Sequence, residues 1–160
     1  MEAIRHLTEV LKSQVALYSE LCDLIEMEKS AITSWAVDKT VEITKRKEEI
    51  LRREHIQQEA RKLLLEQIAR AHDSENATIS DVITYAEGSE YSGHLEGLCE
   101  RLVELIKRIH AENLSLRMLY TTNCRMINEF FTQAGLSEMD NSYAPGAKSH
   151  KKVSTMFRIG

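Results

Sequence analysis

The first 87 residues of the chain contain neither glycine nor proline, because the first glycine is Gly88 and the only proline is Pro145. An all-β fold of this length needs many sharp turns, and glycine and proline are the residues that form them. Hydrophobic residues make up 42% of the 160 residues, which is enough apolar material for one core. The sequence therefore predicts an all-α protein.

A regular apolar stripe indicates a first long helix over residues 2–36. Its positions, three or four residues apart, are Ile4, Leu7, Leu11, Gln14, Tyr18, Leu21, Ile25, Glu28, Ile32 and Trp35. A second apolar set beside the stripe widens the face, which indicates packing against more than one helix. These residues are Val10, Val15, Leu17, Cys22 and Leu24.

A second helix is expected over residues 39–72, with Asp38 or Thr40 accepting hydrogen bonds from the amides at its start. Its middle, Lys45 to Lys62, has eleven charged residues in eighteen and should be largely solvated. Apolar residues restore a core face near its end. These are Leu63, Leu64, Leu65, Ile68 and Ala69.

Thr78 is expected to cap a short helix that Gly88 ends, and a third long helix should follow over residues 92–134. Its heptad stripe reads Leu95, Leu98, Leu102, Leu105, Ile109, Glu112, Leu116, Leu119, Asn123, Met126 and Phe130. The predicted fold is an elongated antiparallel bundle of three long helices and one short helix. We expect a bundle domain over 1–136 and a flexible tail over 137–160, because the tail lacks periodicity and carries four basic and two acidic residues.

Several functional classes find no support in the sequence. It lacks the metal spacings, phosphate loops and nucleophile elbows that enzymes use, so we expect no cofactor, no metal and no catalysis. The net charge of −4 disfavours nucleic acid as a partner. A secretion signal and a membrane-spanning run are also missing, which predicts a cytoplasmic protein without membrane insertion. A thiol-dependent enzyme using Cys22, Cys99 or Cys124 is an alternative that the residue types alone leave open.

The third long helix has apolar residues on several sides near its C-terminal end, and these are the best candidate for a functional surface. Leu114, Met118, Ile127 and Phe131 lie off the heptad stripe, beside Met126 and Phe130. Methionine-rich apolar surface suits a groove for a partner helix, because the thioether adapts to varied shapes. The same residues would equally serve as the core of a bundle or of a homodimer. Glu28 and Asn123 interrupt their stripes, either as a polar site or to fix the register of the helices.

Four short motifs resemble those of the FlgN-type flagellar export chaperones. The second helix has Lys47-Glu48-Glu49-Ile50-Leu51 and then Arg61-Lys62-Leu63-Leu64, similar to that family's Lys-x-x-Leu-Leu and Arg-x-x-Leu-Leu pattern. Thr78-Ile79 resembles the start of its short helix, and Asn113-Leu114 the middle of its third long helix. Ser142-Tyr143-Ala144-Pro145-Gly146 is similar to its tail motif.

The resemblance implies a non-catalytic chaperone that binds the C-terminal helical region of hook-filament junction proteins. It also implies delivery of that cargo to the cytoplasmic domain of the type III export gate, with Tyr143 as the residue that contacts the gate. The cargo contact is expected near the end of the third long helix, at Leu116, Met118, Leu119, Met126, Ile127, Phe130 and Phe131. The alternative is a self-assembling structural bundle that carries no cargo.

Overall fold

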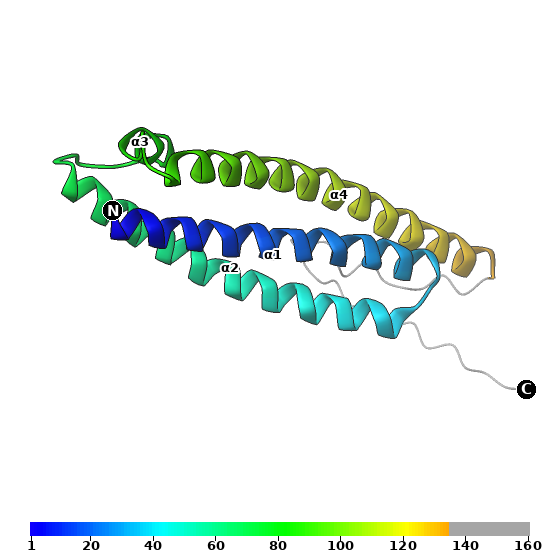
Figure 1. Cartoon of the computed structure of the whole chain (residues 1–160). Coiled ribbons are helices and arrows are strands. Elements are labelled where there is room, and N and C mark those ends of the chain that lie inside the picture. The colour runs from blue at the N-terminus through cyan, green and yellow to red at the C-terminus, as the bar shows by residue number, and fades with distance from the viewer. Residues whose placement is uncertain (135–160) are drawn as a thin grey trace, which may run out of the picture. The chain divides into compact units, whose positions relative to one another are not determined.

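The computed structural model describes residues 1–134. The regular secondary structure of these residues is entirely helical. The helices are α1 (Glu2–Thr33), α2 (Val37–Ala71), α3 (Ile79–Tyr85) and α4 (Tyr91–Gln133) (Figure 1). The prediction of an all-α fold with three long helices and one short one is confirmed, with helix ends within three residues of those expected. The predicted domain boundary after residue 136 and the tail of 137–160 lie outside the described residues.

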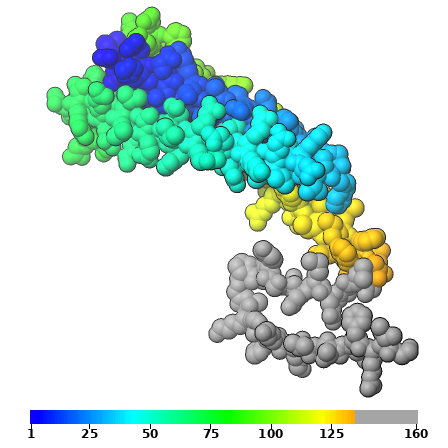
Figure 2. Space-filling view, turned by 90° about the horizontal axis from the view of Figure 1, so that it is seen from below, coloured from blue at the N-terminus to red at the C-terminus, as the bar shows by residue number. Residues whose placement is uncertain are grey.

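The chain divides into two compact units, Met1–Asn123 and Cys124–Gly160, and α4 supplies residues to both. In the first unit α2 runs antiparallel to α1, since Lys47 contacts Glu28 and Arg61 contacts Gln14. Figure 2 shows α1 and α2 side by side on one face of this unit. The portion of α4 in the first unit runs parallel to α1, because the connection through α3 reverses the chain a second time (Figure 1).

The corner between α1 and α2 differs from the expected one. Neither Asp38 nor Thr40 caps α2, because the helix already begins at Val37 and its N-cap is Ala36, which has no capping side chain. Trp35 was expected on the buried stripe, but α1 ends at Thr33. Trp35 then takes a positive φ of 57°, which turns its side chain out of the stripe and leaves it 56% exposed.

The start of α3 is as predicted. The Thr78 hydroxyl accepts a hydrogen bond from the Asp81 amide at 3.3 Å, and the Asp81 carboxylate accepts one from the Thr78 amide at 2.8 Å. This reciprocal capping box satisfies two amides that a helix of seven residues otherwise leaves open. The hydrogen bond from the Thr78 hydroxyl to the Asp81 carboxylate, together with the one from the Thr78 amide, lowers the pKa of the Asp81 carboxyl. Gly88 follows the helix at a φ of +79°, a conformation that favours glycine.

The buried apolar residues form two clusters. The first, which we call the four-helix cluster, takes residues from or beside all four helices: Ile4, Leu7, Leu11, Ile68, Val82, Ala86, Leu95 and Leu102. The second, the hairpin cluster, takes its buried residues from α1 and α2 alone: Leu17, Leu21, Leu24, Ile25, Ala31, Ile43 and Ile50. Helix α1 therefore packs on more than one neighbour, as its wide apolar face predicts.

Helix α2 is buried along a narrow line. Ile50 is buried while Leu51 and Ile56 are exposed, which agrees with the solvated middle predicted from its charges. Leu63 was expected in the core but is 63% exposed. Successive helical residues are 100° apart, so the three adjacent leucines 63–65 spread over more of the helix than one buried face covers.

Among residues 1–134, no helix combines the length and hydropathy that crossing a bilayer requires.

Candidate partner-binding surface

In the first unit, the later turns of α4 expose apolar side chains. The hairpin cluster receives only Ile109 from this helix, as a partly buried neighbour. Met118 is 66% exposed, and Leu114 is also exposed. Leu116 is buried, with 5% of its surface exposed, and Leu119 is partly exposed. This part of α4 therefore has an inner line that includes Leu116 and an apolar outer side.

In the second unit, the last turns of α4 are apolar on several sides. Met126, Ile127 and Phe130 are exposed, and Phe131 is partly exposed. The rings of Phe130 and Phe131 meet edge to face, with centroids 5.9 Å apart. This arrangement is one of the favourable geometries for two aromatic rings.

Helix α4 is longer than α1, beside which it runs in the first unit. It has 43 residues, whereas α1 has 32. Tyr120 of α4 lies opposite Glu28 of α1, and α1 ends five residues later at Thr33.

A buried carboxylate joins the three long helices near this surface. Glu28 of α1 is 4% exposed and accepts hydrogen bonds from Lys47 of α2 at 2.6 Å and from the Tyr120 hydroxyl of α4 at 2.8 Å. Burial and the bond to Glu28 raise the pKa of Tyr120 to about 12. Lys29, the next residue of α1, pairs with Glu112, which lies eight residues before Tyr120 on α4. We call Glu28, Lys47 and Tyr120 the Glu28 junction.

A second buried carboxylate lies between the two apolar clusters. Glu54 of α2 accepts hydrogen bonds from the Tyr18 hydroxyl at 2.7 Å and from the Gln14 amide at 3.5 Å. Arg61 in turn donates to the Gln14 carbonyl oxygen at 3.2 Å, so Gln14 bridges an anion and a cation. Burial and the bond to Glu54 raise the pKa of Tyr18 to about 12. We call these four residues the Glu54 junction.

The sequence indicated only part of this arrangement. The interruption of the α1 stripe at Glu28 predicted a polar site or a register-fixing residue, and the structure places that residue in a three-helix contact. Asn123, the other interruption, is partly exposed. The partners Lys47, Glu54 and Arg61 belong to the highly charged middle of α2, where the sequence distinguishes no single residue. Tyr143 lies outside the described residues.

The described residues offer little for catalysis or metal binding. Residues 1–134 contain no group of three or more histidine, cysteine, aspartate or glutamate side chains placed to hold a metal ion. Cys22 is buried and Cys99 partly buried, and burial raises the pKa of both thiols, which disfavours the nucleophilic thiolate. Cys124 is exposed. What the surface does offer is exposed apolar area on the later turns of α4.

Comparison with known proteins identifies a family for most of the chain. A family model described as FlgN protein matches residues 1–149. No curated protein and no solved structure matches the chain.

Proposed function

The chain belongs to the FlgN family of flagellar export chaperones, and we propose that it carries hook-filament junction proteins to the type III export gate in the cytoplasm. The family binds flagellar export substrates and is a family of chaperones rather than enzymes. We infer that this chain works without catalysis or a cofactor. It covers the C-terminal helical region of its cargo before assembly and passes the cargo to the cytoplasmic domain of the gate.

The single observation that supports this proposal most is the exposed apolar surface on the later turns of α4. The proposed cargo contact comprises Leu116, Met118 and Leu119 in the first unit and Met126, Ile127, Phe130 and Phe131 in the second. Leu116 is buried, so its role is to support the neighbouring turns from within. The other residues are exposed or partly exposed and are available to a cargo helix.

The free energies of burial and of association suit a contact that must also be released. Fully burying one large apolar side chain contributes about 1.5–3 kcal/mol. Association costs about 4–15 kcal/mol in lost freedom, before side chains are ordered. Six such residues contribute at most about 9–18 kcal/mol, a gain of the same order as the cost, so a contact of this size can be reversible.

The cargo contact is tested by replacing Met118 or Phe130 with aspartate and measuring co-purification of the junction protein. Both side chains are more than 60% exposed, so the helical circular dichroism signal should stay unchanged while capture falls at least tenfold. Ile56→Asp is the matched control, because Ile56 is equally exposed but lies on α2. Equal capture by all three variants would contradict the proposal and favour the self-assembling bundle.

We propose the tail as the contact with the gate, through Tyr143 as the resemblance to the family implies. A lone large aromatic residue beside the Pro145-Gly146 turn signal can act as an anchor when a partner supplies a pocket. Truncation after Asp140 should spare cargo capture and lower affinity for the cytoplasmic domain of the gate, and Tyr143→Ala should reproduce most of the loss. Loss of cargo capture on truncation, or unchanged affinity for the gate in both variants, would show that this assignment is wrong.

A further inference from the structure

Helix α3 packs against residues of α2 and α4 in the four-helix cluster. Beside it lies an open pocket of about 270 Å³, lined mainly by Ile79 and Ile83 of α3 and by Cys99, Leu102, Val103 and Ile106 of α4. Ser80 of α3, Tyr18 of α1 and Arg61 of α2 complete the lining. We call this pocket and the polar one next to it the α3 groove. All of its residues belong to the first unit, and none is part of the cargo contact proposed above.

The wall that α4 contributes is apolar and incompletely covered. Val103 and Ile106 are about half exposed, although their neighbours Leu102 and Leu105 are buried. Positions three apart lie on the same side of a helix, so the two exposed side chains present one continuous apolar edge. A partner with apolar side chains at helical spacing would cover it.

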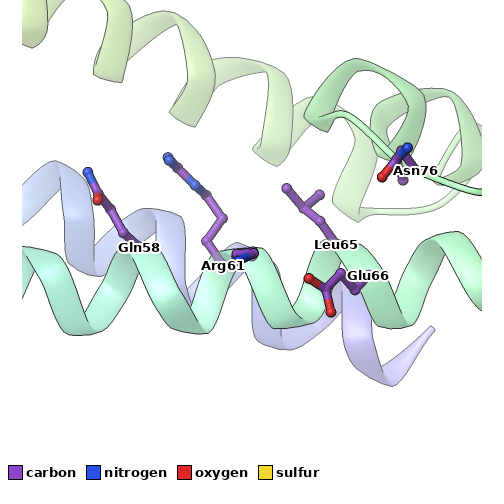
Figure 3. A pocket seen from close by; sticks show the side chains of 7 residues that line it. Gln58, Arg61, Leu65, Glu66 and Asn76 are labelled. Carbon is purple, nitrogen blue, oxygen red and sulfur yellow. The ribbon is translucent and has the colours of Figure 1, made fainter.

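The wall that α2 contributes is positively charged. The adjoining pocket of about 290 Å³ is lined by Gln58, Arg61, Lys62, Leu65, Glu66, Asn76 and Ala77. Figure 3 shows Gln58, Arg61 and Leu65 pointing from α2 into the space beneath α4, with Asn76 at its far end. Arg61 lines both pockets and connects them.

The two cations of this wall have no carboxylate partner in the part of the chain that the structure describes. Neither Arg61 nor Lys62 forms an ion pair within residues 1–134, whereas the one lining acid, Glu66, already pairs with Arg70 at 3.9 Å. Arg61 uses one N–H on Gln14, and a guanidinium carries five. The groove therefore combines an apolar wall with cations that have unused donors.

We propose that the α3 groove binds an amphipathic helix of a partner protein, with leucine-sized side chains on Val103 and Ile106 and carboxylates on Arg61 and Lys62. A helix fits because the exposed apolar side chains of Val103 and Ile106 lie three residues apart on α4, a spacing that the apolar face of a second helix can match. Acidic flanks fit because a carboxylate pairs with a guanidinium through two parallel hydrogen bonds. This site is additional to the cargo contact and gives the chaperone a second protein interface.

The test uses two synthetic peptides of eighteen residues that both place leucine at helical positions i, i+3, i+4 and i+7. One carries glutamate at the flanking positions and the other carries lysine. Fluorescence anisotropy with the full chain should show binding of the glutamate peptide and at least tenfold weaker binding of the lysine peptide. Ile106→Asp and Lys62→Glu should each weaken binding of the glutamate peptide at least fivefold.

Ile56→Asp and Lys12→Glu are the matched controls, since both residues are exposed and neither lines the groove. Circular dichroism checks that each variant keeps the helical content of the parent. The proposal is overturned if the two peptides bind equally, if the controls lose as much affinity as the groove variants, or if neither peptide binds. It is also overturned if Ile106→Asp instead dissociates a dimer of the chain in sedimentation, because the occupant would then be a second copy.

Discussion

At the scale of single residues, the most informative feature is the Glu28 junction. A carboxylate that is 4% exposed is costly unless it is paired and hydrogen-bonded, and here one lysine and one tyrosine from two other helices satisfy it. The charge therefore specifies how α2 and α4 align with α1, and any sliding of a helix would leave the carboxylate unpaired. The Glu54 junction does the same for α1 and α2, with Gln14 as the bridge.

We expect Lys47→Met to lower the free energy of unfolding by about 2–3 kcal/mol, because the buried Glu28 carboxylate loses its charged donor. Chemical denaturation measures this change. Lys45→Met is the control, since Lys45 is exposed two residues away and should change stability by less than about 0.5 kcal/mol. Equal effects of the two substitutions would contradict a specific role for the Glu28 junction.

The sequence predicts the burial of some residues but not of others. The apolar periodicity identifies Leu7, Leu11 and Ile25 as buried, because the helix period alone places them on one face. It does not place Trp35, since the end of α1 is decided by the corner that follows. Nor does it identify Glu54 as the partner of Tyr18, because that pairing depends on the alignment of two helices joined by a turn.

At the scale of elements, α4 changes character along its length. Its early turns are held by apolar contact, with Leu95 and Leu102 in the four-helix cluster. Its later turns in the first unit add polar contacts to α1: Arg108 with Glu26 at 3.9 Å, Glu112 with Lys29, and Tyr120 with Glu28. The sequence predicted one continuous stripe along this helix, and only the structure shows that the contacts change from apolar to polar.

Salt should therefore loosen the later turns of α4 more than the early ones. Partly exposed ion pairs contribute only ~0.2–1 kcal/mol and are screened, whereas apolar contacts are not. Raising the salt concentration should speed amide hydrogen exchange over residues 108–123 by roughly two- to fivefold and leave residues 95–102 unchanged. The hairpin cluster of α1 serves as the internal reference. Uniform acceleration along α4 would show that the division proposed here is wrong.

At the scale of the whole molecule, the two junction tyrosines make stability depend on pH at the alkaline end. The pKa of each phenol rises from 10.0 to about 12 on folding. The neutral phenol is thus favoured in the folded chain, so its contribution is complete below the unfolded pKa of 10.0 and is lost as the pH rises through about 12.

The free energy of unfolding should accordingly fall between pH 10 and 12, and the slope should be smaller in a Tyr18→Phe, Tyr120→Phe double variant. Denaturation curves recorded across this range measure the slope. Lysine side chains titrate in the same range and are common to both proteins, so the difference between the two slopes isolates the phenols. Identical slopes would mean that the tyrosines ionise equally in the folded and unfolded chains.

The hairpin cluster also sets the order in which the chain can fold during synthesis. Its buried residues all come from α1 and α2, so they are complete once residue 71 has been made. Ribosomes add about 5–20 residues per second, which puts Leu102 roughly 1.5–6 seconds later. Because contacts close in sequence form fastest, we expect the α1–α2 hairpin to assemble first and the four-helix cluster to stay open on Ile4, Leu7 and Leu11 until Leu95 and Leu102 have been made. During that interval the newborn chaperone itself exposes an apolar surface of the kind that chaperones cover.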